Sequence, residues 1–260
     1  MSFLTSIILG LIQGVTEFLP VSSSAHLALV KHFFRLDETP YSLLIDLCCH
    51  VGTLLALMAF FWRDLTETLR SPRSIFLYFL ALIPLVPAYF FFKSLRALLS
   101  GDIFLGPCLI LSGLILLAGQ SLRMTRSQEW KKSPRKRDVL MIGALQSMAL
   151  IPGISRSAAT LSCARVLGWR VREAVRFSFL LSIPTVLGGS AIELIGHATQ
   201  SQTDSWPAGP LLVATISSFL TGFFVIHRAV TYLEKGNFKP LAGYVITLGS
   251  FVTLYFACIH

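Results

Sequence analysis

Residues 13–26, QGVTEFLPVSSSAH, place a carboxylate, three serines and a histidine within an apolar N-terminal stretch. Gln13 and Glu17 are four residues apart, so they share one face of a helix that is expected to end near Pro20. A carboxylate in a long apolar segment is costly without a partner and is therefore a candidate functional group. The alternative is a glutamate that merely reaches a polar interface.

A second helix is expected directly after Pro20, with Ser22, Ser23 and Ser24 in its first turn. The free N–H groups and the positive end of the helix dipole favour an anion there. His26 lies three residues after Ser23, so a hydroxyl and an imidazole share a face, as a nucleophile and its acid or base do. Ordinary capping by serine is the competing interpretation.

A similar serine-rich cluster, PGISRS, occupies residues 152–157 and adds Arg156 between Ser155 and Ser157. A guanidinium stays charged, matches the geometry of phosphate oxygens and can stabilise charge in a transition state. The hydroxyls of both clusters are candidate phosphate ligands. Together the clusters predict an anion site with acid–base groups, as phosphoryl transfer requires. A purely structural ion pair of Arg156, for example with Glu17, is the alternative.

Asp46 and His50 form another pair of polar residues four positions apart. Three roles stay open for them: supporting the catalytic groups from behind, binding a metal ion, or lying at the membrane interface.

The elements that must position these residues are predicted to be membrane helices. The chain is 54% hydrophobic and 13% charged, with a mean hydropathy of +0.70, whereas about a quarter of the residues of an average soluble domain are charged. Six apolar runs are long enough to cross a bilayer as helices. They cover residues 42–62, 75–92, 104–122, 176–196, 211–228 and 241–258.

The net charge of +9 is concentrated between the hydrophobic segments, which is typical of cytoplasmic loops and argues against nucleic-acid binding. Residues 63–73 and 228–239 are predicted on the same cytoplasmic side, whereas 197–210, without Lys or Arg, is predicted outside. The principal basic block comprises Arg123, Arg126, Lys131, Lys132, Arg135, Lys136 and Arg137. Four further arginines, Arg165, Arg170, Arg172 and Arg176, fit a cytoplasmic rim.

Two other apolar stretches, 3–33 and 139–167, are interrupted by proline and are predicted to be helix–break–helix hairpins that do not cross the membrane. Both contain the pattern G-x-x-Q before the break, beginning at Gly10 and Gly143. We interpret this as an internal repeat of about 1–122 and 139–260, joined by a basic cytoplasmic linker at 123–138, within one membrane domain. Three spans follow each hairpin, and because three is odd the repeat is inverted.

The predicted fold is therefore an all-α integral membrane protein with six spanning helices and two re-entrant hairpins. Irregular backbone is tolerated at membrane depth only where it is buried in protein or lines a wet cavity. The hairpins would enter from opposite sides, so their broken tips are expected to meet near the midplane and to build such a cavity.

At these positions the chain resembles the undecaprenyl-diphosphate phosphatase family, the bacitracin-resistance type of membrane phosphatase. The resemblance is carried by QGVTEFLPVSSSAH at 13–26 and PGISRSAAT at 152–160, with HVGTLLA at 50–56 and FSFLLSIP at 177–184. It extends over essentially the whole chain.

The resemblance implies hydrolysis of undecaprenyl diphosphate to the monophosphate and inorganic phosphate, on the outer face of a bacterial inner membrane. Glu17 takes the essential carboxylate position of the family motif (E/Q)-x-x-x-E, in which Gln13 is an allowed variant. Ser23, His26 and Arg156 match the other functional positions. The nucleophile, whether Ser23, His26 or water, stays open.

The family also implies a divalent cation, Mg²⁺ or Ca²⁺. We expect it to be weakly held, with Glu17 and Gln13 as its protein ligands and substrate phosphates and water supplying most of the coordination. The chain departs from the family at Ala25 and Ala158, where glycine is usual, and each adds a methyl group near a tight helix start. A secondary transporter or lipid translocase is the leading alternative function, since both use inverted repeats. A lipid-binding scaffold is a third. A homodimer stays open.

Overall fold

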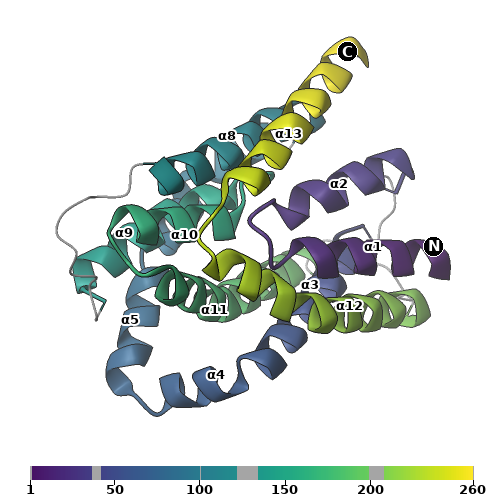
Figure 1. The fold of residues 1–260 in the computed structure, drawn as a ribbon. Coiled ribbons are helices and arrows are strands. Elements are labelled where there is room, and N and C mark those ends of the chain that lie inside the picture. The colour runs from purple at the N-terminus through teal and green to yellow at the C-terminus, as the bar shows by residue number, and fades with distance from the viewer. Residues whose placement is uncertain (1, 37–41, 100, 122–133, 199–207, 260) are drawn as a thin grey trace.

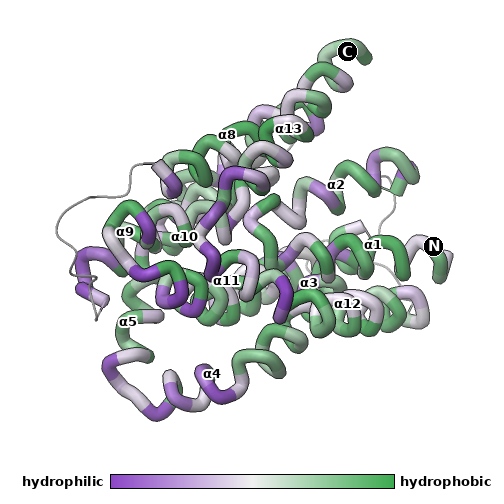
Figure 2. Tube along the Cα trace, in the orientation of Figure 1, coloured by the Kyte–Doolittle hydropathy of each residue, from purple (hydrophilic) through white to green (hydrophobic). Residues whose placement is uncertain are grey.

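The computed structural model describes residues 2–36, 42–99, 101–121, 134–198 and 208–259, and helices are the only regular secondary structure in these ranges (Figure 1). Most of the basic block at 123–137 and the central part of the loop at 197–210 lie outside them. Hydrophobic residues make up much of every long helix (Figure 2), and many large apolar side chains are exposed, as a lipid-facing surface requires.

Among the described residues, six helical segments are long and apolar enough to cross a membrane, which confirms the predicted spans. The second span is divided into two helices at Ile83 and Pro84, because proline cannot continue the hydrogen-bond ladder. The fourth and fifth extend beyond the predicted ranges, since their polar ends stay helical. The spans are α3 (Ser42–Phe60), α5 (Pro72–Leu82) with α6 (Leu85–Phe91), α8 (Asp102–Ser121), α11 (Val171–Ala198), α12 (Ala208–Glu234) and α13 (Lys239–Ile259). The chain is a multi-pass integral membrane protein.

The two proline-interrupted stretches each form two short helices around a break. In the first, α1 (Phe3–Thr16) is followed by α2 (Ser23–Phe33). In the second, α9 (Lys136–Gln146) leads through the 3₁₀ helix η1 (Ser147–Leu150) to α10 (Arg156–Val166). The outer ends of α1 and α2 lie toward the end of the molecule that carries both chain termini, whereas α9 begins at the opposite end (Figure 1). Two short connectors, α4 (Trp62–Leu69) and α7 (Lys93–Leu99), complete the described helices.

Helices of the two halves of the chain pack against each other. The helix α1 packs along α12, and α9 packs along α5, while α8 lies against α13 and α10. The contact of α1 with α12 and the contact of α9 with α5 each need a glycine. A Cβ at Gly10 would lie 2.7 Å from the Cβ of Ser217 on α12, and one at Gly143 would collide with the backbone of Ala81 on α5. These close approaches fix each broken segment against a spanning helix from the other half.

Ion pairs tie the helix ends together on the side where α4 lies. Arg176 at the start of α11 binds Asp64 at 2.6 Å and Glu67 at 2.9 Å, and both acidic residues belong to α4. Arg165, which is predicted on the cytoplasmic rim, is buried and donates to the carbonyl oxygen of Trp169 at 3.0 Å. It thus binds a carbonyl group just beyond the end of α10.

Candidate active site

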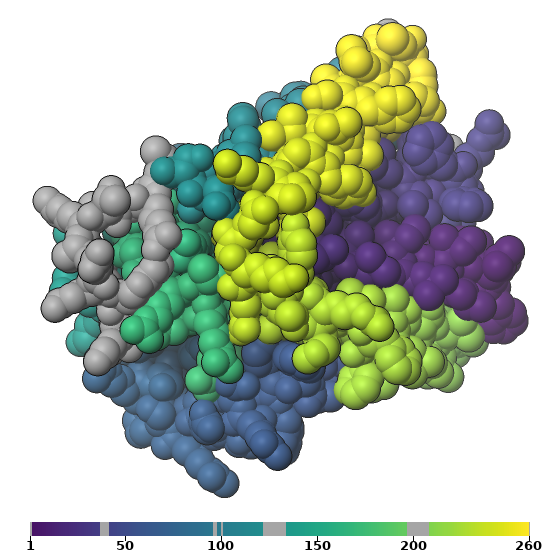
Figure 3. Space-filling model, viewed as in Figure 1, coloured from purple at the N-terminus to yellow at the C-terminus, as the bar shows by residue number. Residues whose placement is uncertain are grey.

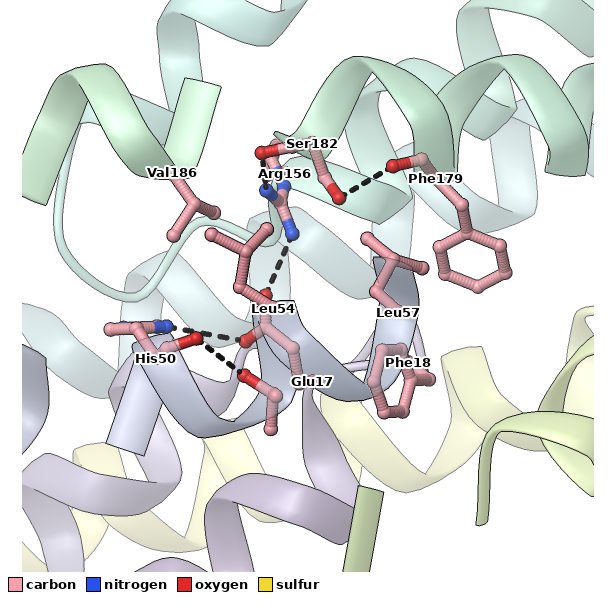
Figure 4. A pocket seen from close by; sticks show the side chains of 10 residues that line it. Glu17, Phe18, His50, Leu54, Leu57, Arg156, Phe179, Ser182 and Val186 are labelled. Atoms are coloured by element: carbon pink, nitrogen blue, oxygen red, sulfur yellow. Dashed lines mark hydrogen bonds and ion pairs between the residues drawn. The ribbon is translucent and has the colours of Figure 1, made fainter. Parts of the chain in front are cut away.

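The two breaks meet inside the helix bundle. Arg156, the first residue of α10, donates from Nη2 to Oε1 of Glu17 at 2.8 Å (Figure 4). The hydroxyl of Ser157 donates to the carbonyl oxygen of Leu19 at 3.4 Å, so the backbone of one break also contacts the other. The Glu17 and Arg156 side chains are 10% and 18% exposed. The two charges are therefore largely removed from water, and their mutual attraction offsets the free-energy cost of that desolvation.

Two donors bind the other oxygen of Glu17. Oε2 accepts hydrogen bonds from Ser23 Oγ at 2.6 Å and from Gln13 Nε2 at 2.9 Å. Nδ1 of His50 lies 3.6 Å from the same oxygen. Hydrogen bonds to an ionised carboxylate are short and strong. Ser23 is thus held with its proton directed at a carboxylate, which is the relation between a nucleophile and a general base.

Gln13 is fully buried and orients Glu17 through its amide group. Besides the bond to Glu17, its Nε2 donates to Nδ1 of His50 at 2.8 Å. The opposite orientation of the amide would direct its oxygen toward the carboxylate, so the nitrogen must face Glu17. The remaining oxygen, Oε1, is buried and without a hydrogen-bond partner.

The first break is closed by a strained residue. Ser22 has φ 66° and ψ 85°, a left-handed conformation that is uncommon for a residue with a side chain and costs on the order of 1–3 kcal/mol. Its side chain makes no capping bond to α2 and instead lies 3.3 Å from Ser24 Oγ. The twist directs the Ser22 carbonyl oxygen at Nδ1 of His26, 2.8 Å away.

The second break is braced from α8. The hydroxyl of Ser112 accepts from the Ser155 N–H at 2.9 Å and donates to the Gly153 carbonyl oxygen at 3.2 Å. Gly153 has φ +92°, and a Cβ there would lie 2.7 Å from the Cβ of Cys108. Ser155 Oγ caps α10 by accepting from the N–H of Ala158 at 3.2 Å, and it also lies 3.2 Å from Ser157 Oγ. The Ser155 hydroxyl thus has a structural role, and its role as a phosphate ligand stays a prediction.

His26 lies apart from the Ser23–Glu17 contact. Its Nδ1 faces the Ser22 carbonyl, and its Nε2 lies 2.8 Å from the hydroxyl of Tyr244 on α13. The expected partnership of Ser23 with His26 is replaced by that of Ser23 with Glu17. Sequence reasoning missed Tyr244 altogether, since nothing in the sequence links residues 218 positions apart.

The pair of Asp46 and His50 is divided between two places. His50 joins the carboxylate cluster, whereas Asp46 binds the buried Lys31 of α2 at 2.6 Å. Asp46 therefore ties α3 to α2, and only His50 lies near the reacting groups.

A small, partly open pocket lies beside the Glu17–Arg156 pair (Figure 4). The structure describes all of the predicted catalytic, phosphate-binding and metal-binding residues. Only Glu17 and Arg156 among them line this pocket. The lining comprises Glu17, Phe18, His50, Thr53, Leu54, Leu57, Arg156, Phe179, Ser182 and Val186.

Comparison with known proteins identifies the family. The family model described as "Bacitracin resistance protein BacA" matches residues 6–251. The chain belongs to this family. It is 37% identical over 251 residues to the "Undecaprenyl-diphosphatase" of Protochlamydia amoebophila, covering 95% of this chain and 96% of that protein. It is 34% identical over 266 residues to the protein of the same name from Moorella thermoacetica, covering 98% of each chain.

The oxygen atoms at the site fit a weakly held cation. Among the described residues no three His, Cys, Asp or Glu side chains come together as a metal cluster. Glu17 offers a carboxylate and Gln13 offers an unpartnered amide oxygen, both hard donors of the kind that Mg²⁺ and Ca²⁺ bind. A cation held by only these two protein ligands would take most of its coordination from substrate phosphates and water, as the resemblance to the family predicted.

Ala25 and Ala158, where the resemblance predicted a departure from the family, are both fully buried. Ala25 packs with Val21, Leu29 and Val245 in the cluster between α2, α8 and α13. Ala158 belongs to the main core. Both methyl groups face protein and lie outside the pocket lining described above.

Proposed function

We propose that this protein hydrolyses undecaprenyl diphosphate to undecaprenyl phosphate and inorganic phosphate. Relatives that align over almost the whole chain carry the name undecaprenyl-diphosphatase. The observation that carries the proposal is the Glu17–Arg156 contact, with Ser23 on the same carboxylate. An arginine for phosphate, a hydroxyl and a base are the minimum for displacement at phosphorus.

In the membrane, the two broken segments would be re-entrant hairpins of an inverted repeat, about 1–122 and 139–260. The exchanged packing of α1 on α12 and α9 on α5 supports this arrangement. The glutamines of the two G-x-x-Q patterns support it as well. Both are buried, and each donates to the first spanning helix of its own half, Gln13 to His50 and Gln146 to Thr185 at 3.1 Å.

The site would open to the outer side of a bacterial inner membrane. The support is the positive charge of the connections at 63–73, 123–137 and 228–239, which favours their cytoplasmic location. The segment at 197–210 and the outer ends of α1 and α2 then face outward. The prenyl chain would stay among the lipids while the diphosphate enters the pocket.

In the reaction, Arg156 would hold the terminal phosphate and spread its charge. Ser23 Oγ would attack the terminal phosphorus as its proton passes to Oε2 of Glu17, already 2.6 Å away. The new O–P bond forms as the anhydride bond breaks, and undecaprenyl phosphate leaves with the electron pair and takes up the proton from Glu17. The Glu17 carboxylate then accepts a proton from water as the water oxygen attacks the phosphorus. The bond between phosphorus and Ser23 Oγ breaks, Ser23 Oγ regains a proton from Glu17, and inorganic phosphate is released. A divalent cation, when bound by Glu17, Gln13 and the substrate, would neutralise further phosphate charge.

Hydrolysis is tested by phosphate release from undecaprenyl diphosphate with detergent-purified protein. Glu17→Ala and Arg156→Ala should abolish release, because each removes one member of the pair. Matched controls are Glu67→Ala and Arg172→Ala, whose side chains are 69% and 86% exposed, and these should retain activity. Equal activity of all four variants would refute the site. Lipid movement without phosphate release would instead indicate a translocase.

The nucleophile is tested by acid quench during turnover and mass spectrometry. A phosphate on Ser23 is the expected adduct. A phosphate on His26 would reassign the nucleophile, and an unmodified protein at every quench time would favour direct attack by water.

A further inference from the structure

The ring of His26 is held from both sides by groups of different chemistry. The carbonyl oxygen of Ser22 lies 2.8 Å from Nδ1, and a carbonyl can only accept, so Nδ1 carries a proton. In the neutral ring Nε2 is then the acceptor, and the Tyr244 hydroxyl at 2.8 Å must be its donor. If Nε2 gains a proton, the oxygen of the same hydroxyl group can accept a hydrogen bond from the new N–H group, and neither ring has to move.

Tyr244 also stacks on His26. The ring centroids are 5.8 Å apart with an interplanar angle of 21°. Aromatic contacts of this kind prefer offset geometry and restrict ring rotation. The orientation of His26 is therefore restricted by hydrogen bonds at both ring nitrogens and by the neighbouring Tyr244 ring.

The backbone around Tyr244 is anchored by buried neighbours. Val245, the next residue, is fully buried in the cluster that includes Ala25, the residue directly before His26. In the space-filling view α13 adjoins the region of α1 and α2 (Figure 3). Tyr244 itself is 49% exposed, so the burial of its own ring explains its position only in part.

We propose that Tyr244 is a positioning residue for His26. Its hydroxyl binds Nε2 and, together with the Ser22 carbonyl at Nδ1, holds the ring orientation used during phosphate-anhydride hydrolysis. The proposal rests on the proposed function. It makes one residue of the last helix part of a site that is otherwise built by the two breaks.

A double-mutant cycle tests this role. Tyr244→Phe keeps the stacked ring and removes one hydrogen bond, so we expect kcat to fall about threefold to tenfold with little change in KM. Added to His26→Ala, the same change should alter kcat by less than about twofold, because its target is gone. The matched control is Tyr255→Phe, which alters a tyrosine of the same helix that contacts the ring of His32 instead. It should leave kcat within about twofold of the parent value.

An unchanged kcat in Tyr244→Phe, or an equal loss in both backgrounds, would overturn the inference. Nitrogen-15 NMR of labelled histidine gives a readout that does not depend on activity, with His26→Ala for assignment. The Nδ1–H tautomer is expected in both proteins, because the Ser22 carbonyl remains. The signal of Nε2 is expected to shift in Tyr244→Phe, because this nitrogen loses its hydrogen bond. The same spectrum for both would contradict the role of Tyr244. A parent protein that shows the predicted spectra but releases no phosphate would refute only the proposed function.

Discussion

The two breaks occupy similar positions in the two halves but use their serines differently. In the second break the backbone is capped and braced, because Ser155 caps α10 and Ser112 binds both sides of the turn. In the first break Ser22 is left-handed and makes no side-chain cap, and Ser23 is bound to Glu17. The hydrogen bonds of the second break hold the backbone that carries Arg156, whereas in the first break the Ser23 hydroxyl binds the Glu17 carboxylate.

This difference shows how a repeated motif can specialise. A serine that satisfies backbone N–H groups stabilises the fold, and its lone pairs are occupied. A serine that does not cap the helix, such as Ser23, can take part in chemistry. The free-energy cost in this break is the backbone strain at Ser22. Changes to the first break should therefore affect activity more than stability, and changes to the second should do the reverse, except at Arg156.

The largest effect is expected for Glu17→Gln, which keeps the shape of the side chain. It removes the proton acceptor of Ser23 and leaves Arg156 without a countercharge. We expect kcat for phosphate release to fall by at least about 10³-fold. Steady-state assays in detergent measure this fall, with folding checked by size-exclusion chromatography. A correctly folded variant with more than a tenth of the parent activity would contradict the role of Glu17.

Replacing Ser23 with alanine should give the next largest loss, roughly 10²–10³-fold in kcat, with little change in thermal stability. The control is Ser24→Ala, since Ser24 is exposed and hydrogen-bonded only to Ser22 among the contacts described. It should retain at least about half of the activity. Equal losses in the two variants would show that the first break acts as a whole and not through Ser23.

For the second break, Ser112→Ala should destabilise the protein by about 1–3 kcal/mol, because the buried N–H of Ser155 loses its acceptor. Thermal unfolding in detergent measures the shift. Ser250→Ala is the control, since its hydroxyl serves only a carbonyl of its own helix in the contacts described. If Ser112→Ala unfolds at the parent temperature, the brace is not what holds this break.

Ser155→Ala should have the smallest effect. Loss of the cap is worth about 1 kcal/mol, and kcat should stay within about threefold of the parent value. Unfolding and phosphate release are measured on the same preparation. A large loss of activity at unchanged stability would instead favour the predicted role of Ser155 in phosphate binding.

Much of the architecture could be predicted from the sequence because it follows from composition. Apolar length defined the six spans, and proline defined the two breaks. The meeting of Glu17 with Arg156 followed from the opposite orientation expected for the hairpins, although they lie 139 residues apart.

The partners that tune the site could not be predicted. Ser112 and Tyr244 are polar residues within long apolar helices, and neither the helical period nor the residue spacing identifies their contacts. Arg165 was predicted on a cytoplasmic rim, and it binds a buried carbonyl group. His26 matched a nucleophile–base spacing, yet its ring lies between the Ser22 carbonyl and Tyr244. Such details depend on packing between distant segments.

The central claim is that both breaks bind one diphosphate. It is tested most directly by an experimental structure with a methylene diphosphonate analogue of the prenyl substrate, whose bridging carbon resists hydrolysis. We predict the terminal phosphorus within hydrogen-bonding reach of the Arg156 guanidinium and in line with Ser23 Oγ, beside Glu17. A headgroup bound elsewhere, with the Glu17–Arg156 pair intact and out of contact, would contradict the account.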